Sequence, residues 1–99
     1  MDKETALEIV REYAELVYAI LPQSRIVLFG SYACGVPGEH SDLDVAVVID
    51  RLEGDFLDLS VSLHKLRHSI DERIEPILLV ADQDRSGFLE SILKTGYVL

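Results

Sequence analysis

Basic residues are scarce in this sequence of 99 amino acids, where 9 Lys and Arg stand against 18 Asp and Glu for a net charge of −9. A protein that grips DNA or RNA through phosphates needs clustered Lys and Arg, and so does one that binds an anionic membrane surface. The charge balance therefore argues against both classes of partner. An acidic chain can still handle a nucleotide when Mg²⁺ supplies the positive charge.

Cysteines and long apolar runs are scarce as well. The single cysteine, Cys34, has no second cysteine for an internal disulfide, which fits a reducing compartment. No apolar run approaches the ~20 residues that span a bilayer, and the first residues are acidic where a signal peptide is basic. These absences predict a soluble cytoplasmic protein. The length and the hydrophobic content of 48% predict one globular domain over residues 1–99.

Apolar periodicity predicts three helices. The first carries apolar residues at i, i+3, i+4 and i+7, with Asp2 as a cap and Pro22 as its stop. The last has Ser86 as its cap and Gly96 at its end. The three helices are expected over residues 3–21, 55–71 and 86–95.

Short apolar runs predict three strands, over residues 25–30, 43–49 and 73–80. Pro76 lacks an N–H, which suits an edge strand or a position early in a strand. The element order is α-β-β-α-β-α, and the middle helix is long enough for a crossover, which makes the second and third strands parallel. The predicted fold class is α+β, with a mixed three-stranded sheet and the helices packed on one face.

Two aspartates, Asp42 and Asp44, open the second strand. Successive side chains of a strand point to opposite faces, so these two project to the same side, about 6–7 Å apart. Acids on an otherwise buried strand are costly without positive charge between them, and two divalent cations ~3.5–4 Å apart suit the gap. Glu75, near the start of the third strand, lies beside them if the two strands are parallel.

Gly30 and Ser31 directly follow the first strand, where a tight turn exposes backbone N–H groups that are able to cradle a phosphate. Gly30 lets a ligand approach the chain closely, and Ser31 adds a hydroxyl donor. The pair by itself also fits a plain turn in the Gly- and Pro-rich loop over residues 31–41. The sequence spacing between Gly30-Ser31 and the two aspartates makes the combined pattern more specific than the Gly-Ser pair alone.

Gly30-Ser31, ten residues and the segment Ser41-Asp42-Leu43-Asp44-Val45 together resemble the signature of the DNA polymerase beta-like nucleotidyltransferases. More narrowly, the whole chain resembles the minimal nucleotidyltransferases, the antitoxin half of the HEPN/MNT pairs. The resemblance implies the small polymerase beta-like fold. It also implies that Gly30, Ser31 and Ser41 bind the nucleotide and that Asp42 and Asp44 bind Mg²⁺. Glu75 would complete the metal site or take a proton from the attacking hydroxyl.

The activity implied by the resemblance is transfer of a nucleoside monophosphate, AMP from ATP, to a hydroxyl acceptor with two Mg²⁺ ions. The implied acceptor is a tyrosine of a helical HEPN toxin, which the modification silences. The alternative is a binding module that has kept the fold without turnover. It would cover its partner through the apolar tail Tyr97–Leu99 or the helix face of His64 and His68.

Two departures from the family pattern bear on that alternative. Many members carry basic residues where this chain has Tyr32 and Cys34, so positive contacts to a triphosphate must come from elsewhere. The third acid is Glu75, where Asp is commoner. The candidate sources of positive charge are Lys65, Arg67 and Arg73.

Several other residues allow two interpretations. His64 and His68 share a helix face at a spacing that suits zinc, but no further Cys or His cluster accompanies them, which favours a solvated or partner-facing role.

His40 is expected to be a loop residue, with a substrate-side role as the alternative. Cys34 lacks a base partner and is expected to be a small loop residue rather than a nucleophile. Tyr32 either contacts a nucleotide or packs against the first helix. Self-association through the apolar tail stays open.

Overall fold

The computed structural model describes residues 2–34, 42–84 and 86–99. The elements follow one another as α1 (Lys3–Ile20), β1 (Arg25–Phe29), α2 (Ser31–Cys34), β2 (Leu43–Ile49), α3 (Phe56–Leu66), η1 (Arg67–Ser69), β3 (Ile74–Val80), η2 (Ala81–Gln83), α4 (Phe88–Thr95) and β4 (Tyr97–Val98). All three predicted helices and all three predicted strands are present. Within the described ranges no helix is long and apolar enough to cross a membrane.

The four strands form one mixed sheet in the order β3-β2-β1-β4. Strand β2 runs parallel to β3, as the crossover predicts, and antiparallel to β1. The prediction of three strands is wrong by one, because Tyr97 and Val98 pair with Leu28 and Val27 at the far edge. Two residues are too few for an alternating pattern, so only pairing with β1 identifies this strand.

Strand β3 lies at one edge of the sheet, as Pro76 predicts. The Leu43 N–H donates to the Arg73 carbonyl at 2.9 Å, so residue 73 bonds toward β2. In a parallel pair alternate residues bond toward the neighbour, so Pro76 belongs to the set that points outward. Its missing N–H therefore costs the sheet no hydrogen bond.

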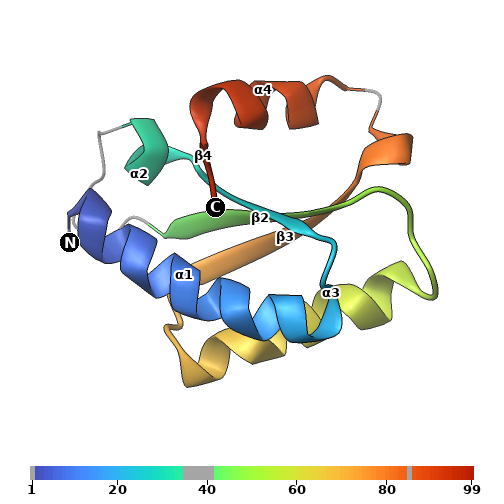
Figure 1. Cartoon of the computed structure of the whole chain (residues 1–99), viewed down its shortest axis with the longest axis horizontal. Coiled ribbons are helices and arrows are strands. Elements are labelled where there is room, and N and C mark those ends of the chain that lie inside the picture. Colours follow the sequence, from blue (N-terminus) through green and yellow to red (C-terminus); the bar gives the residue numbers. More distant parts are fainter. Residues whose placement is uncertain (1, 35–41, 85) are drawn as a thin grey trace.

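Helices cover both faces of the sheet, which corrects the prediction that they pack on one (Figure 1). Helices α1 and α3 share the larger core with one face, and α4 packs Ile92 against Val27, Ala46 and Val48 on the other. The reason is the composition of β2, in which every residue except Asp44 is buried. A strand that is apolar on both faces needs a cover on each.

The ends of the helices differ from the prediction at two places. The helix expected over residues 55–71 is α-helical only to Leu66 and continues as the 3₁₀ turn η1. Helix α4 begins at Phe88 rather than at Ser86, although the Ser86 hydroxyl does accept a hydrogen bond from the Phe88 N–H at 3.2 Å. Asp2 caps α1 as predicted, by accepting from the Thr5 N–H at 2.8 Å.

A buried hydrogen bond joins α1 to α3. The Tyr13 hydroxyl donates to the Leu63 carbonyl at 2.8 Å, and Tyr13 has no exposed surface. Burial raises the pKa of this hydroxyl, so it stays a neutral donor. The contact holds the end of α3 against the core, directly before the turn that carries Arg67.

Replacing Gly96 with alanine should weaken the packing of α4 against β1. A Cβ atom there would lie 2.6 Å from the Ile92 carbonyl oxygen and 2.8 Å from the Leu28 carbonyl oxygen, both of which are backbone atoms that cannot move cheaply. We expect the free energy of unfolding to fall by about 1–3 kcal/mol in urea denaturation. Ser91→Ala, at an exposed position of α4, is the control. Equal stability of the two variants would contradict the close packing described.

Candidate functional site

The turn after β1 brings a glycine against an aspartate. Gly30 has φ +77°, a conformation that L side chains rarely adopt. A Cβ atom at this position would overlap Oδ2 of Asp44 and lie 3.1 Å from its Cγ. The Asp44 carboxylate thus occupies the space beside the Gly30 backbone, and only glycine leaves room for it.

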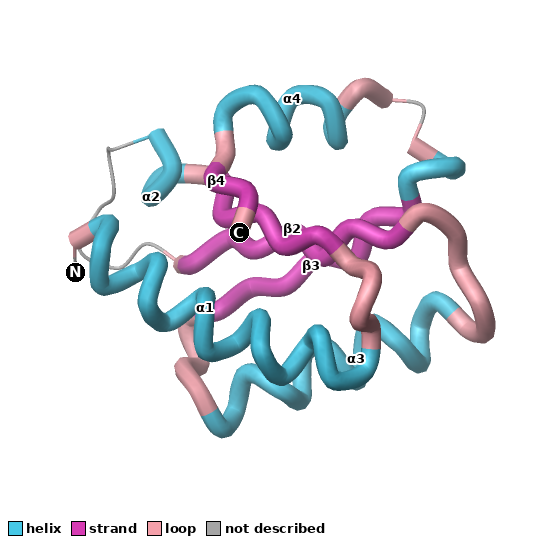
Figure 2. Tube along the Cα trace, in the orientation of Figure 1, coloured by secondary structure: helices cyan, strands magenta, loops and turns pink. Residues whose placement is uncertain are grey.

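The predicted acids gather at one end of the sheet. Asp44 is the register partner of Phe29 on one side and of Glu75 on the other. Figure 2 shows β2 and β3 beginning at the same end, near the short helix α2. Because Leu43 and Ile74 point into the core shared with α1 and α3, Asp44 and Glu75 point to the opposite face. Asp42 precedes the strand and is exposed.

The three negative charges act on one another. Burial raises the pKa of the Asp44 carboxyl, and the neighbouring charges of Asp42 and Glu75 raise it further. Ionisation of Asp44 therefore costs more in the folded protein than in the unfolded chain, and a bound cation would reduce the repulsion. This end of the sheet is an arrangement of oxygen donors that suits a hard divalent ion.

Glu75 is only partly available to such an ion. Nη1 of Arg67 donates to Oε1 of Glu75 at 3.1 Å and to the Ile74 carbonyl at 2.9 Å. Within residues 2–34, 42–84 and 86–99, no three His, Cys, Asp or Glu side chains converge closely enough to hold a metal ion. The donor set still fits Mg²⁺, because this ion commonly keeps several waters and binds one or two carboxylates together with substrate phosphates.

A family model described as a nucleotidyltransferase domain matches residues 5–96, almost the whole chain. The chain belongs to this nucleotidyltransferase domain family. A comparison with curated proteins finds no matching sequence.

Two solved structures share the nucleotidyltransferase fold of this chain, and both are mutants of the toxin–antitoxin complex MntA–HpeT. In one, two aspartates two positions apart are replaced by glutamate; it is 19% identical with a TM-score of 0.55, and the match covers 99% of this chain and 72% of that chain. In the other, a tyrosine is replaced by alanine; it is 22% identical with a TM-score of 0.56, and the match covers 100% and 72%. At these identities the likeness shows the fold.

The structure resolves the interpretation of Tyr32 in this nucleotidyltransferase. Tyr32 lies in the short helix α2, is 2% exposed and belongs to the core shared with α1. It packs against the first helix and is not free to stack on a base. Ser31 and Cys34 are the first and last residues of the same helix. The predicted nucleotide-binding residue Ser41 and the loop residue His40 lie outside the described residues.

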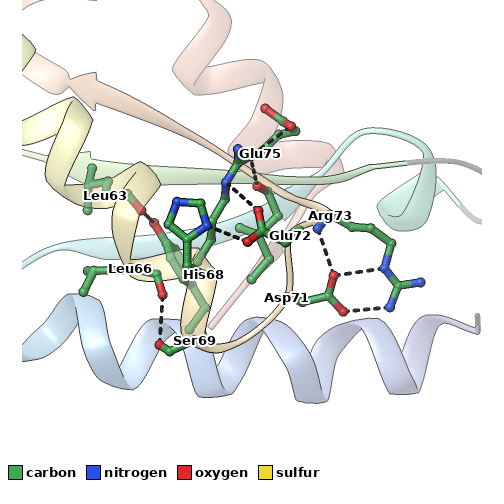
Figure 3. Close-up of polar contacts among 11 residues, drawn as sticks. Leu63, Leu66, His68, Ser69, Asp71, Glu72, Arg73 and Glu75 are labelled. Carbon is green, nitrogen blue, oxygen red and sulfur yellow. Dashed lines mark hydrogen bonds and ion pairs between the residues drawn. The ribbon is translucent and has the colours of Figure 1, made fainter.

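The three candidate cations are placed differently. The Arg73 guanidinium binds Asp71 through two hydrogen bonds, from Nε to Oδ1 at 3.0 Å and from Nη2 to Oδ2 at 2.7 Å, and this pairing lowers the pKa of Asp71 (Figure 3). Arg67 is bound to Glu75 at the site itself. Lys65 is exposed on α3, which covers the face of the sheet opposite to Asp44.

The histidine pair does not form a metal site in the described part of the chain. Nδ1 of His68 lies 2.5 Å from Oε1 of Glu72, so this ring is paired with a carboxylate, while His64 is exposed on α3. Glu72 also faces Arg67, with its Oε2 3.9 Å from Nε. His68 therefore belongs to a polar network with Glu72 and Arg67.

A hollow of about 770 Å³ lies at the other end of the sheet and is lined by Leu21, Ile49 and Arg51 among others. Ile49 ends β2, five residues beyond Asp44, which separates the hollow from the acids by about 17 Å. The Gly30 turn and the acids do not line it.

Sequence reasoning missed the contact between Gly30 and Asp44 and the ion pair between Arg67 and Glu75. The sequence pattern marks Arg67 only as a candidate source of positive charge for a triphosphate. The seven residues between Arg67 and Glu75 contain the turn that leads into β3, which reverses the chain and brings the guanidinium to the edge of that strand. No local spacing rule reports such a contact.

Proposed function

We propose that this nucleotidyltransferase moves a nucleoside monophosphate, AMP from ATP, to a hydroxyl acceptor in the presence of Mg²⁺. The observation that carries the proposal is the close approach of the Gly30 turn to Asp44, with Asp42 and Glu75 beside it. A backbone that binds phosphates and carboxylates that bind a metal need this proximity, because the ions would be held by the carboxylates and the phosphates together. Family membership supports transferase chemistry in general.

Each residue has a distinct role in the proposal. The backbone at Gly30 and Ser31 faces the β- and γ-phosphates, and Ser41 contributes to nucleotide binding. Asp42 and Asp44 hold two Mg²⁺ ions. The bound ions supply positive charge that stabilises the transition state and the departing pyrophosphate.

The reaction is a substitution at the α-phosphorus. The acceptor oxygen forms a bond to this phosphorus while the bond to the bridging oxygen of the β-phosphate breaks, and pyrophosphate leaves with the electron pair. Glu75 accepts the proton of the acceptor hydroxyl or adds a third carboxylate to the metal site. The position of Glu75 beside Asp44 on the edge strand β3 supports this role, and in the proposal the acceptor approaches over that edge.

We infer that the acceptor is a tyrosine of a helical HEPN toxin, which makes this chain an antitoxin. The fold neighbours support the inference, because they come from a toxin–antitoxin complex. In those structures, paired aspartates and a tyrosine were the residues chosen for substitution. The spacing of the substituted aspartates equals that of Asp42 and Asp44 here.

Transfer of label from α-labelled ATP tests the proposal. The chain is purified with the protein that accompanies it, and the wild type is compared with Asp42→Asn/Asp44→Asn in the presence of Mg²⁺. We expect label on the partner with the wild type alone. Label with both forms, or with neither while the complex stays intact, would overturn the proposed activity.

The second candidate function is a binding module without turnover. The observation that favours it is the Arg67–Glu75 ion pair, which takes up the third carboxylate. A module of this kind would neutralise the partner by contact alone. It predicts that Asp42→Asn/Asp44→Asn still protects cells from the toxin, whereas the transferase predicts loss of protection.

A further inference from the structure

Arg67 forms a bridge at the edge of β3, next to the proposed cation site. A single nitrogen, Nη1, donates both to the Ile74 carbonyl and to Glu75 Oε1, at 2.9 and 3.1 Å. On its other side, Nε lies 3.9 Å from Oε2 of Glu72. The Arg67 side chain is 21% exposed and the Glu75 side chain 46%, so the pair is at the surface but anchored by a backbone carbonyl.

This bridge explains an otherwise unexpected feature of the acids. Glu75 and Asp44 are register partners on adjacent parallel strands and point to the same face. Even so, no three acidic side chains converge in the described ranges. The Glu75 carboxylate is bound to a guanidinium, and that guanidinium is fixed in turn to the backbone of β3.

We propose that Arg67 is a positioning residue that holds Glu75 out of the cation site while the site contains no nucleotide. The inference rests on the proposed function in one respect, that a divalent cation binds at Asp42 and Asp44. In this proposal, Glu75 leaves Arg67 to reach such a cation. Arg67 and the cation therefore compete for the same carboxylate.

The competition predicts how the cation affinity changes on mutation. Removing Arg67 frees Glu75 to join Asp42 and Asp44, so a cation gains a third carboxylate. Removing a positive charge also favours cation binding without any release of Glu75. The design must separate these two effects, and the chain offers a matched control. The control is Arg73, a second arginine close to the start of β2. It is also paired with a carboxylate, but that carboxylate belongs to Asp71 and not to Glu75.

The experiment measures Mn²⁺ binding to the nucleotide-free protein, from the electron paramagnetic resonance signal of the free ion. The variants are Arg67→Gln, Glu75→Gln, the double variant and Arg73→Gln. We expect Arg67→Gln to bind Mn²⁺ about three- to fivefold more tightly than the wild type, beyond the change seen with Arg73→Gln. In the Glu75→Gln background, the effect of Arg67→Gln should shrink to that of Arg73→Gln.

Equal effects of Arg67→Gln in both backgrounds, or no Mn²⁺ binding by Arg67→Gln, would overturn the inference. Circular dichroism establishes that each variant is folded. If loss of the bond to Ile74 prevents folding of Arg67→Gln, Arg67→Lys replaces it. Lysine keeps the charge but lacks the planar fork, and an affinity gain of about twofold is expected, with no gain overturning the inference.

The outcomes separate this inference from the proposed function. A coupling between Arg67 and Glu75 in Mn²⁺ affinity, in a protein that transfers no label from ATP, would leave the inference standing and overturn the transferase. Label transfer without that coupling would overturn the role of Arg67 alone.

Discussion

Replacing Asp44 with asparagine should lower nucleotide transfer by about a thousandfold while making the folded protein more stable. The loss of activity follows from the loss of a charged oxygen ligand at the place where the Gly30 turn meets the acids. The gain in stability follows from the environment of the carboxyl, because an amide is neutral and is not repelled by Asp42 and Glu75. A substitution that lowers activity and raises stability indicates that the charge serves function at the expense of folding.

The pH dependence has a definite sign. Burial raises the pKa of the Asp44 carboxyl in the folded protein above its ordinary value, so the folded protein binds this proton more tightly than the unfolded chain does. The free energy of unfolding therefore falls as pH rises from the unfolded-state pKa of Asp44 to its folded-state pKa. Above the folded-state pKa, the protein bears the full cost of an ionised Asp44. The melting temperature of Asp44→Asn should exceed that of the wild type most at neutral pH, and the difference should shrink in acid.

The measurement is thermal unfolding followed by circular dichroism, without divalent cations and with a chelator present. Asp82→Asn is the matched control, since Asp82 is an exposed acid that follows β3 at the other end of the sheet. It should leave both activity and the pH profile nearly unchanged. A melting temperature of Asp44→Asn below that of the wild type at neutral pH would contradict the repulsion inferred among the acids.

Replacing Gly30 with alanine should also lower nucleotide transfer strongly, for a steric reason. The new Cβ would occupy the position of the Asp44 carboxylate, and φ of +77° is itself unfavourable for alanine. We expect a loss of about 1–2 kcal/mol of stability from the backbone alone. Transfer should fall by about a hundredfold or more, because the carboxylate must move to make room.

Gly87→Ala separates these two contributions. Gly87 has nearly the same backbone conformation, with φ +78°, but an added Cβ there has no neighbour within 4 Å. This variant should show the same backbone cost in urea denaturation and should keep its transferase activity. If Gly30→Ala is no less active than Gly87→Ala, the contact between Gly30 and Asp44 has no functional role.

The sequence by itself determined the main elements and the adjacency of the acids. Apolar periodicity is a local property, so it predicts each long helix and each main strand. The crossover helix then requires β2 and β3 to be parallel, and this topology brings Glu75 beside Asp44 without any further information. Pro76 predicted an edge strand or a position early in a strand, and it lies early in β3, which is at an edge.

Only the tertiary structure decided the features that depend on contacts between distant segments. Strand β4 exists because Tyr97 and Val98 meet β1, and α4 covers the second face because α1 and α3 already fill the first. The pairing of Glu75 with Arg67 depends on the path of the turn before β3. The local sequence pattern indicates which face of a helix or strand a residue occupies. The residues that it contacts depend on how distant segments of the chain fold around it.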